Sequence, residues 1–372
     1  MKEKSIDITI KPTMACNMKC LHCFNGDAFI DKAMLDVKEA IKFMELACKE
    51  YSLIKVTFHG GEPTLAGYDF YKAFFTSQRQ LISRYNVKVR NIITTNGLLL
   101  TDKLIELFKE NFVQICVSYD GPYNYVLRQN SEKVLNNILR AKDSGADVKC
   151  YCTISKQSVK HLEEIYYWFR NHRINFKTLP IEKRGYAINS TELVMPIEDL
   201  VNNFARTYLI WIKDTDCKVS YSTFEEFANL RRATMHRKFW FGRKIALNSD
   251  GNLYTFGRPN DIKFSIGSVW NVKSLSNCFE SKCYVDFLSY LKEKRNVKCK
   301  NCKSNIICGG VNINIAYLYV DDENLVDYSC AQSDALFQRI LEINDNIIMD
   351  FQHRNIDDYN EYVKNAFAEF ID

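Results

Sequence analysis

A regular alternation of strand and helix patterns in the first half of the chain constrains the fold most. Six segments have the apolar runs or the two-residue alternation of β-strands, at residues 5–10, 53–58, 87–95, 112–119, 147–154 and 175–179. Five segments with helical spacing of apolar residues separate them, at 35–51, 68–85, 101–111, 132–143 and 158–171. Such alternation predicts parallel βαβ units and an α/β fold. It leaves open whether the sheet is doubly wound or curves into a partial (β/α) barrel.

The second half has a different pattern, so we place a domain boundary near residue 190, between units 1–190 and 191–372. Ser249-Asp250-Gly251 predicts a hairpin between strands 244–247 and 252–256. The remaining patterns are helical, at 196–213, 222–237, 281–294 and, in two stretches, from about 332 onward. The second unit is therefore expected to be a smaller α+β domain.

The composition is typical of a globular protein of the cytoplasm. Hydrophobic residues make up 47% and charged residues 26% of 372, which excludes disorder. A net charge of +5 is too small to indicate nucleic-acid or membrane binding. The sequence has no apolar run of membrane-spanning length, and its N-terminus lacks the apolar centre of a signal peptide.

Fourteen cysteines are unusual for such a protein, and seven of them lie in two groups. The cytoplasm keeps thiols reduced, so grouped cysteines are better interpreted as metal ligands than as disulfides. Cys16, Cys20 and Cys23 follow the first strand, at the end of a parallel sheet that carries the chemistry. Three thiolates can hold three irons of a [4Fe–4S] cluster and leave the fourth iron open. The alternative is a zinc site with His22 as the fourth ligand.

The second group supplies four thiolates, which suit a fully ligated [4Fe–4S] cluster or a structural zinc ion. Its members are Cys299, Cys302, Cys308 and Cys330. The other seven cysteines are by default small buried apolar residues.

The stretch CNMKCLHCF, from Cys16 to Phe24, resembles the signature of the radical S-adenosylmethionine (SAM) enzymes. Further motifs of that family follow the next predicted strands: Gly60-Gly61-Glu62-Pro63, Thr95-Asn96-Gly97 and Ser118-Tyr119-Asp120-Gly121-Pro122, with Arg128 downstream. The resemblance implies that Gly60, Gly61, Glu62, Pro63, Asn96, Ser118 and Arg128 contact SAM. Glu62 would meet its ammonium group and Arg128 its carboxylate. One departure is Ser155, in a stretch where relatives often carry Asn.

The same resemblance implies a six-stranded partial barrel similar to a TIM barrel. It also implies the reductive cleavage of SAM. SAM would bind the open iron of the Cys16, Cys20 and Cys23 cluster. One electron would then cleave it to methionine and a 5′-deoxyadenosyl radical, which abstracts hydrogen from a substrate. A reductase, flavodoxin or ferredoxin would supply that electron.

The late cysteines look like the second auxiliary cluster of the SPASM extension found behind some radical SAM domains. Thiolates for the first auxiliary cluster are missing from the corresponding neighbourhoods, at 239–242, 250–256 and 308–312. Cys278 and Cys283 lie nearby, but we expect them to be core residues. One auxiliary [4Fe–4S] cluster is therefore expected.

SPASM relatives mostly modify peptides or proteins, by thioether or carbon–carbon crosslinks or by epimerisation. Sulfatase maturation, which forms formylglycine, is a less favoured alternative because Phe256-Gly257 replaces a Cys-Asp step. Only 15 residues precede Cys16, so a separate protein or a different surface of this one is expected to bind any peptide leader. A small-molecule dehydrogenase and, in another class, a non-catalytic iron–sulfur protein are further alternatives.

A thiol near the substrate could donate hydrogen to a substrate radical, as an epimerase requires. Cys116, Cys150 and Cys152 lie on two predicted strands and are weak candidates. Burial as small apolar residues is the simpler interpretation of all three. His59 is expected to order the loop at Gly60.

Overall fold

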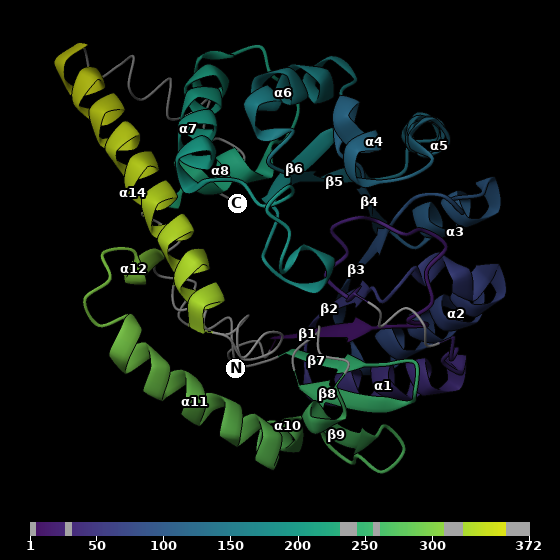
Figure 1. Cartoon of the computed structure of the whole chain (residues 1–372). Coiled ribbons are helices and arrows are strands. Elements are labelled where there is room, and N and C mark those ends of the chain that lie inside the picture. The colour runs from purple at the N-terminus through teal and green to yellow at the C-terminus, as the bar shows by residue number, and fades with distance from the viewer. Residues whose placement is uncertain (1–4, 27–31, 231–243, 256–260, 309–322, 355–372) are drawn as a thin grey trace.

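The computed structural model describes residues 5–26, 32–230, 244–255, 261–308 and 323–354 (Figure 1). Among these residues, nine strands form one sheet in the order β6-β5-β4-β3-β2-β1-β7-β8-β9. Their bounds are β1 Ser5–Ile10, β2 Leu53–Phe58, β3 Lys88–Thr95, β4 Val113–Ser118, β5 Val148–Ile154, β6 Asn175–Pro180, β7 Lys244–Leu247, β8 Asn252–Thr255 and β9 Ser265–Ser268. The six strands predicted in the first half are confirmed, and each is parallel to its neighbour.

The predicted helices between these strands are also confirmed. They are α1 Val37–Glu50, α2 Gly67–Tyr85, α3 Asp102–Glu110, α5 Ser131–Asp143 and α6 Leu162–Asn171, with the short helix α4 Asn124–Leu127 before α5. Side-chain caps fix the starts of α1 and α3. The Asp36 carboxylate and Glu39 form a capping box on α1, and the Thr101 hydroxyl accepts a hydrogen bond from Leu104 N on α3.

Every second residue of the parallel strands packs against these helices. Ile6, Ile8 and Ile10 of β1 join one large apolar core with residues such as Phe43 and Phe58. Each side chain of this kind contributes roughly 1.5–3 kcal/mol when it is fully buried. The alternation of strand and helix in the sequence follows from this single shared core.

The other face of the parallel strands carries polar side chains. Asp7 of β1 and Lys55 of β2 pair there at 3.4 Å, and Thr9 and Lys11 are buried. A doubly wound sheet would have helices and apolar residues on both faces. Figure 1 shows the helices α1 to α6 on the outer side of a curved sheet, which agrees with the predicted partial barrel.

The predicted hairpin is confirmed, but its position in the sheet was not foreseen. Strand β7 pairs in parallel with β1, from Asp7 opposite Lys244 to Ile10 opposite Leu247, and β8 and β9 extend the sheet beyond it. A turn sequence fixes pairing between adjacent strands only, so it gives no information about the distant partner. The division near residue 190 stays a prediction.

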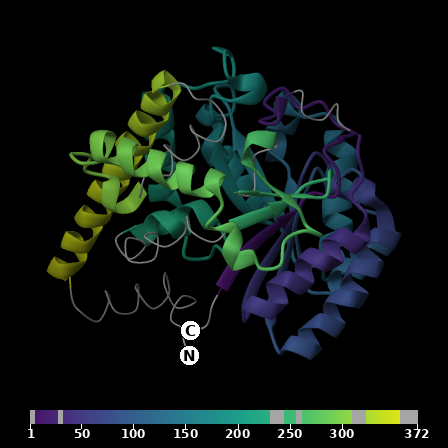
Figure 2. The ribbon, with the colours of Figure 1, turned by 90° about the horizontal axis from the view of Figure 1, so that it is seen from below.

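The remaining helices lie beside the barrel. They are α7 Ile197–Lys213, α8 Ser222–Ala228, α10 Leu275–Cys278, α11 Lys282–Lys298, α12 Asn305–Cys308 and α14 Glu323–Arg354. In Figure 2, as in Figure 1, α14 runs along α7, and the Tyr208 hydroxyl donates to Asn344 Oδ1 at 2.7 Å.

Two of the predicted helices differ from the structure. Helix α8 ends at Ala228 instead of residue 237, and 231–243 lie outside the described residues. Helix α14 is one helix that begins at Glu323, not near 332, because no Gly or Pro interrupts its sequence. Within the part of the chain that the structure describes, no helix is long and apolar enough to cross a membrane.

Candidate functional site

Cys16, Cys20 and Cys23 lie together in the loop after β1, at the carboxyl end of the parallel strands. All three are free thiols and partly buried. The loops after β2, β3 and β4 lie around this cysteine loop and contact it. The cluster-forming residues predicted from the sequence therefore occupy one region of the fold.

The glycine pair after β2 lets two loops touch. Gly61 N donates to Thr13 O at 3.1 Å, and Glu62 N donates to Ala15 O at 2.8 Å. A Cβ atom at Gly61 would overlap the carbonyl oxygens of Met14 and Ala15. Gly60 has a φ of 131°, a conformation that favours glycine. The two glycines thus press the second loop against the backbone that leads into Cys16.

Gly61→Ala is expected to destabilise the protein by about 1–3 kcal/mol and to lower its iron content, because the loop that carries Cys16 must move. The free energy of unfolding and the iron bound after anaerobic reconstitution measure this effect. Gly145→Ala is the control, since the space around Gly145 is open and only its φ of 82° opposes a side chain. A smaller effect of Gly61→Ala than of Gly145→Ala would contradict the steric account.

Glu62 connects the second loop to the third. Its Oε1 accepts hydrogen bonds from Thr64 N at 2.9 Å and from the hydroxyls of Thr64 and Thr95 at 2.6 and 2.7 Å. Its Oε2 accepts from Asn96 N at 2.7 Å. Burial raises the pKa of Glu62, and these donors oppose that shift. The carboxylate predicted to meet SAM is thus occupied by the protein itself, and it fixes Thr95 and Asn96.

Asn96 lies directly over the first cysteine. Its side-chain amide donates to Asn17 Oδ1 at 2.7 Å and lies 3.8 Å from Cys16 Sγ. The backbone N of Asn96 is the group held by Glu62. Asn96 therefore lies where it can contact both the cysteine loop and a ligand bound there.

Arg128 reaches the second cysteine from the far side. Its guanidinium donates to Asp120 Oδ2 at 2.9 Å and to Thr153 Oγ1 at 3.0 Å, and Nη1 lies 3.8 Å from Cys20 Sγ. Asp120 also accepts from Thr153 N at 2.6 Å. Burial raises the pKa of Asp120, and the Arg128 cation opposes that shift. Sequence reasoning named Arg128 but missed Thr153, which lies on a strand outside the recognised motifs.

Burial raises the pKa of the Cys16 thiol to about 11, and it raises the pKa of Cys20 and Cys23 as well. The Arg128 cation opposes the shift at Cys20. Thiols of this kind hold their protons until a metal centre binds the sulfur. Binding of a metal centre at these three sulfurs would therefore release protons.

These residues fit an iron–sulfur cluster better than a single metal ion. No three His, Cys, Asp or Glu side chains among the described residues gather closely enough to hold one ion. The thiolates of a cubane bind different irons, so they need not meet at one point. His22, the fourth ligand of the zinc alternative, has its Nε2 at 3.1 Å from Arg128 Nη2. His22 Nε2 thus faces the Arg128 guanidinium, while Nδ1 of the same ring is buried and has no hydrogen-bond partner in the described part of the chain.

A segment that we interpreted as a domain boundary closes over the third cysteine. Tyr186 N donates to Cys23 O at 3.1 Å, and a Cβ atom at Gly185 would overlap that same oxygen. The Arg184 guanidinium lies 5.0 Å from the centre of the Phe24 ring. Gly185 has a φ of 53°. The sequence around Gly185 gave no sign of this contact, because Cys23 is far away along the chain.

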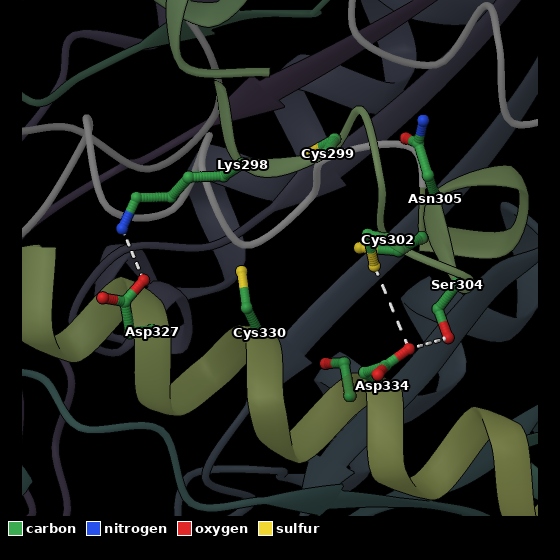
Figure 3. Close-up of a pocket in the computed structure, with 10 residues that line it drawn as sticks. Lys298, Cys299, Cys302, Ser304, Asn305, Asp327, Cys330 and Asp334 are labelled. Atoms are coloured by element: carbon green, nitrogen blue, oxygen red, sulfur yellow. Dashed lines mark hydrogen bonds and ion pairs between the residues drawn. The ribbon is translucent and has the colours of Figure 1, made fainter. Parts of the chain in front are cut away.

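The four late cysteines line one cavity of about 200 Å³ between the end of α11 and α14 (Figure 3). Cys330 projects from α14 toward the loop that carries Cys299 and Cys302. Asp334 accepts a hydrogen bond from Ser304 Oγ at 2.6 Å and lies 3.9 Å from Cys302 Sγ. The sequence grouping of these cysteines corresponds to one place in the fold, with room for a bound group.

The candidate hydrogen donors lie on opposite faces of the sheet. Cys150 and Cys152 are fully buried in the apolar core on the helix side, and burial raises the pKa of both thiols. Cys116 is also buried, but it lies outside that core, and its Sγ is 3.9 Å from Gln114 Oε1. Ser118, at the end of β4, is partly buried, and its side chain makes no hydrogen bond to the cysteine loop among the described residues.

Several other predicted features have clear places. The ring of His59 accepts a hydrogen bond from Gly60 N at 2.8 Å, as expected for a residue that orders this loop. Ser155, at the departure from the family pattern, bonds Ser158 in a local turn. Cys278 is buried in the core, while Cys283 is only partly buried. Of the neighbourhoods expected to lack cluster ligands, 239–242, 256–257 and 309–312 lie outside the described residues.

Comparisons with known proteins give a consistent result. Residues 10–168 match the model of the Radical SAM superfamily. A cysteine-type anaerobic sulfatase-maturating enzyme of Clostridium novyi is 25% identical over 345 residues, which cover 82% of this chain and 87% of that protein.

Two solved structures share the fold. Native anSMEcpe with bound AdoMet and Cp18Cys peptide has a TM-score of 0.75 at 20% identity, over 92% of this chain and 99% of that one. SuiB of Streptococcus suis bound to precursor peptide SuiA has a TM-score of 0.62 at 17% identity, over 86% of this chain and 75% of that one.

Proposed function

Because residues 10–168 of this chain are a radical SAM domain, we propose that the protein is a radical SAM enzyme that modifies a peptide or protein. The family performs radical chemistry on a substrate, so the alternative of a non-catalytic iron–sulfur protein is set aside. The observation that carries the proposal is the loop of Cys16, Cys20 and Cys23, enclosed by Gly61, Asn96 and Arg128 at the carboxyl end of the strands.

In this proposal the three cysteines hold a [4Fe–4S] cluster. With SAM bound, the reduced cluster supplies a 5′-deoxyadenosyl radical that abstracts hydrogen from the substrate. Asn96 and the backbone of Gly60 and Gly61 form one wall of the SAM site, and Glu62 and Pro63 hold that wall in place. Arg128 orients the opposite wall through Asp120 and leaves a guanidinium edge toward Cys20. Ser118 is the remaining residue that the family resemblance assigns to SAM.

The four late cysteines would hold one auxiliary [4Fe–4S] cluster. All four ligands come from the protein, so this cluster has no open iron for a substrate. We therefore assign it to electron transfer or to structure. The cavity between α11 and α14, lined by Cys299, Cys302, Cys308 and Cys330, supports this assignment.

A peptide or protein substrate is favoured by the relatives. SuiB is described with its precursor peptide SuiA, and anSMEcpe with the Cp18Cys peptide. The fold of both covers most of this chain. A separate leader-binding protein and a reductase, flavodoxin or ferredoxin would be the partners.

Sulfatase maturation is the second candidate, and the match to the enzyme of Clostridium novyi over 82% of this chain favours it. The sequence at Phe256-Gly257 argues against it, because the Cys-Asp step expected at that site is missing. The two candidates differ in substrate and product: the first crosslinks or epimerises a peptide, and the second forms an aldehyde at a sulfatase cysteine.

The test is co-expression without oxygen with two kinds of substrate. One is any small peptide encoded beside the gene, and the other is a sulfatase with a cysteine at its maturation site. Mass spectrometry of a modified precursor peptide supports the first candidate, and an aldehyde at the sulfatase cysteine supports the second. Formation of 5′-deoxyadenosine without any peptide or protein product, but with a small molecule consumed, would contradict both.

A further inference from the structure

Two short segments of this chain are strongly basic. One, at 231–244, contains six Lys and Arg and no Asp or Glu, and all of it except Lys244 lies outside the described residues. The other lies next to the late cysteines. Residues 282–303 contain seven Lys and Arg and only two Asp and Glu, a net charge of +5. The whole chain of 372 residues also has a net charge of +5, so the rest of the chain is neutral. This segment consists of α11 and the loop that carries Cys299 and Cys302.

The segment lies beside the four-cysteine cavity. Lys298 lines the cavity itself. Burial raises the pKa of the Cys299 thiol, and the nearby Arg295 cation opposes that shift. Lys300 and Lys303 alternate with Cys299 and Cys302 along the loop. Any charged molecule drawn to these side chains comes close to the group that the cavity holds.

Part of the positive charge is neutralised locally. Lys298 pairs with Asp327 of α14, and Lys282 pairs with Asp286 at 3.0 Å. Lys292, Arg295, Lys300 and Lys303 are exposed, and none of them has an acidic partner in the described part of the chain. We call these four the basic rim.

Exposed apolar side chains accompany the basic rim on α11. Val297 is 75% exposed between Arg295 and Lys298, and Val285 and Leu288 are 48% and 43% exposed. Apolar residues within a charged rim are typical of a surface that binds another protein. A nucleic acid or a lipid headgroup would have no use for them. In Figure 1, α11 lies at the edge of the molecule, where a second protein can approach.

We propose that the basic rim and the exposed apolar residues of α11 are the docking surface for a small acidic one-electron carrier protein. The inference rests on the proposed function, because it assumes an iron–sulfur cluster at the four late cysteines. The carrier gives one electron and is oxidised, the cluster accepts that electron and is reduced, and no bond or proton changes place.

Two physical arguments select this partner. Electron transfer slows steeply with distance, so a donor must dock against the part of the surface nearest the cluster. Opposite charges speed the encounter of two proteins by about 10- to 1000-fold and orient it. The basic rim provides this charge next to the four-cysteine cavity, where an electron has to enter.

The test compares two variants of the iron-loaded full chain with equal changes of charge. Lys292→Glu/Lys300→Glu/Lys303→Glu reverses the basic rim, while Lys103→Glu/Lys133→Glu/Lys160→Glu reverses exposed lysines of the barrel. Binding of an acidic flavodoxin is measured at low and high salt, together with the rate at which it reduces the protein. The rim variant is expected to bind about 10-fold more weakly or worse at low salt, and the control as wild type does.

Reduction by dithionite separates the docking proposal from the proposed function. Dithionite needs no docking surface, so 5′-deoxyadenosine formation driven by dithionite is expected to be equal in wild type, rim variant and control. Equal flavodoxin binding by the rim variant and the control would overturn the docking proposal. If wild type with full iron content forms no 5′-deoxyadenosine with dithionite, the proposed function fails, while the binding comparison still decides the docking surface.

A milder variant shows whether weaker binding comes from the lost charges or from loss of the iron–sulfur cluster. Lys292→Gln/Lys300→Gln/Lys303→Gln removes the three charges without placing acidic groups near Cys299 and Cys302. It is expected to bind flavodoxin with an affinity between those of wild type and the rim variant. An affinity equal to that of wild type, with unchanged iron content, would again overturn the proposal.

Discussion

Asp120→Ala is expected to lower the free energy of unfolding by about 3–5 kcal/mol. The change removes the partner of Arg128 from a pair at 2.9 Å whose side chains are only 9% and 2% exposed. It leaves a buried cation without its counter-charge, and it also removes the acceptor of Thr153 N. Because Arg128 lies beside Cys20, the iron content should fall as well. The shift of the urea unfolding curve measures the loss of stability.

Asp102→Ala is the matched control for this effect. Asp102 pairs with Arg140 at 2.8 Å, but the side chains are 84% and 47% exposed. An exposed pair contributes about 0–1 kcal/mol, so the control should unfold almost as wild type does. Equal effects of the two substitutions would show that Asp120 and Arg128 are not a buried pair in the protein.

The second large effect is expected when the late cysteines are removed together. With Cys299, Cys302, Cys308 and Cys330 all changed to Ala, the iron bound should fall from about eight to about four per chain. Metal binding contributes to folding, so this variant should also be less stable. It should still form 5′-deoxyadenosine with dithionite, because the loop after β1 supplies a separate set of ligands.

Cys217→Ala serves as the control, since Cys217 packs against the core away from both cysteine groups and should leave the iron content unchanged. A quadruple variant that keeps about eight irons would contradict the assignment of these ligands. About twelve irons in wild type would show a third cluster, and Cys278 or Cys283 would then be among its ligands.

The parallel sheet could be predicted because its signal is local. Each strand alternates residues such as Ile6, Ile8 and Ile10 that face the same helices, and each helix carries the matching apolar stripe. The start of a helix could also be predicted where a capping residue marks it, as Thr101 does for α3. The start of α14 was predicted near residue 332, nine residues after its position in the structure, and that prediction was wrong.

The sequence indicated which cysteines gather in the fold, but not which distant segments hold them there. Grouped cysteines and the glycine pair are visible in the sequence because their residue types and spacing form short motifs, although Gly61 contacts Thr13 in a distant loop. The closure of Gly185 over Cys23 and the pairing of β7 with β1 join distant segments, and no local pattern encodes them. Glu62 illustrates a third case, because a motif indicates a residue type but not the atoms that it binds.

The central claim is that Cys16, Cys20 and Cys23 hold the cluster that cleaves SAM. The most direct measurement is iron and 5′-deoxyadenosine, after anaerobic reconstitution and dithionite reduction, in wild type and in Cys16→Ala/Cys20→Ala/Cys23→Ala. The account predicts about eight irons in wild type, about four in the variant, and 5′-deoxyadenosine only in wild type. Unchanged iron in the variant, or 5′-deoxyadenosine formed without these three cysteines, would contradict it.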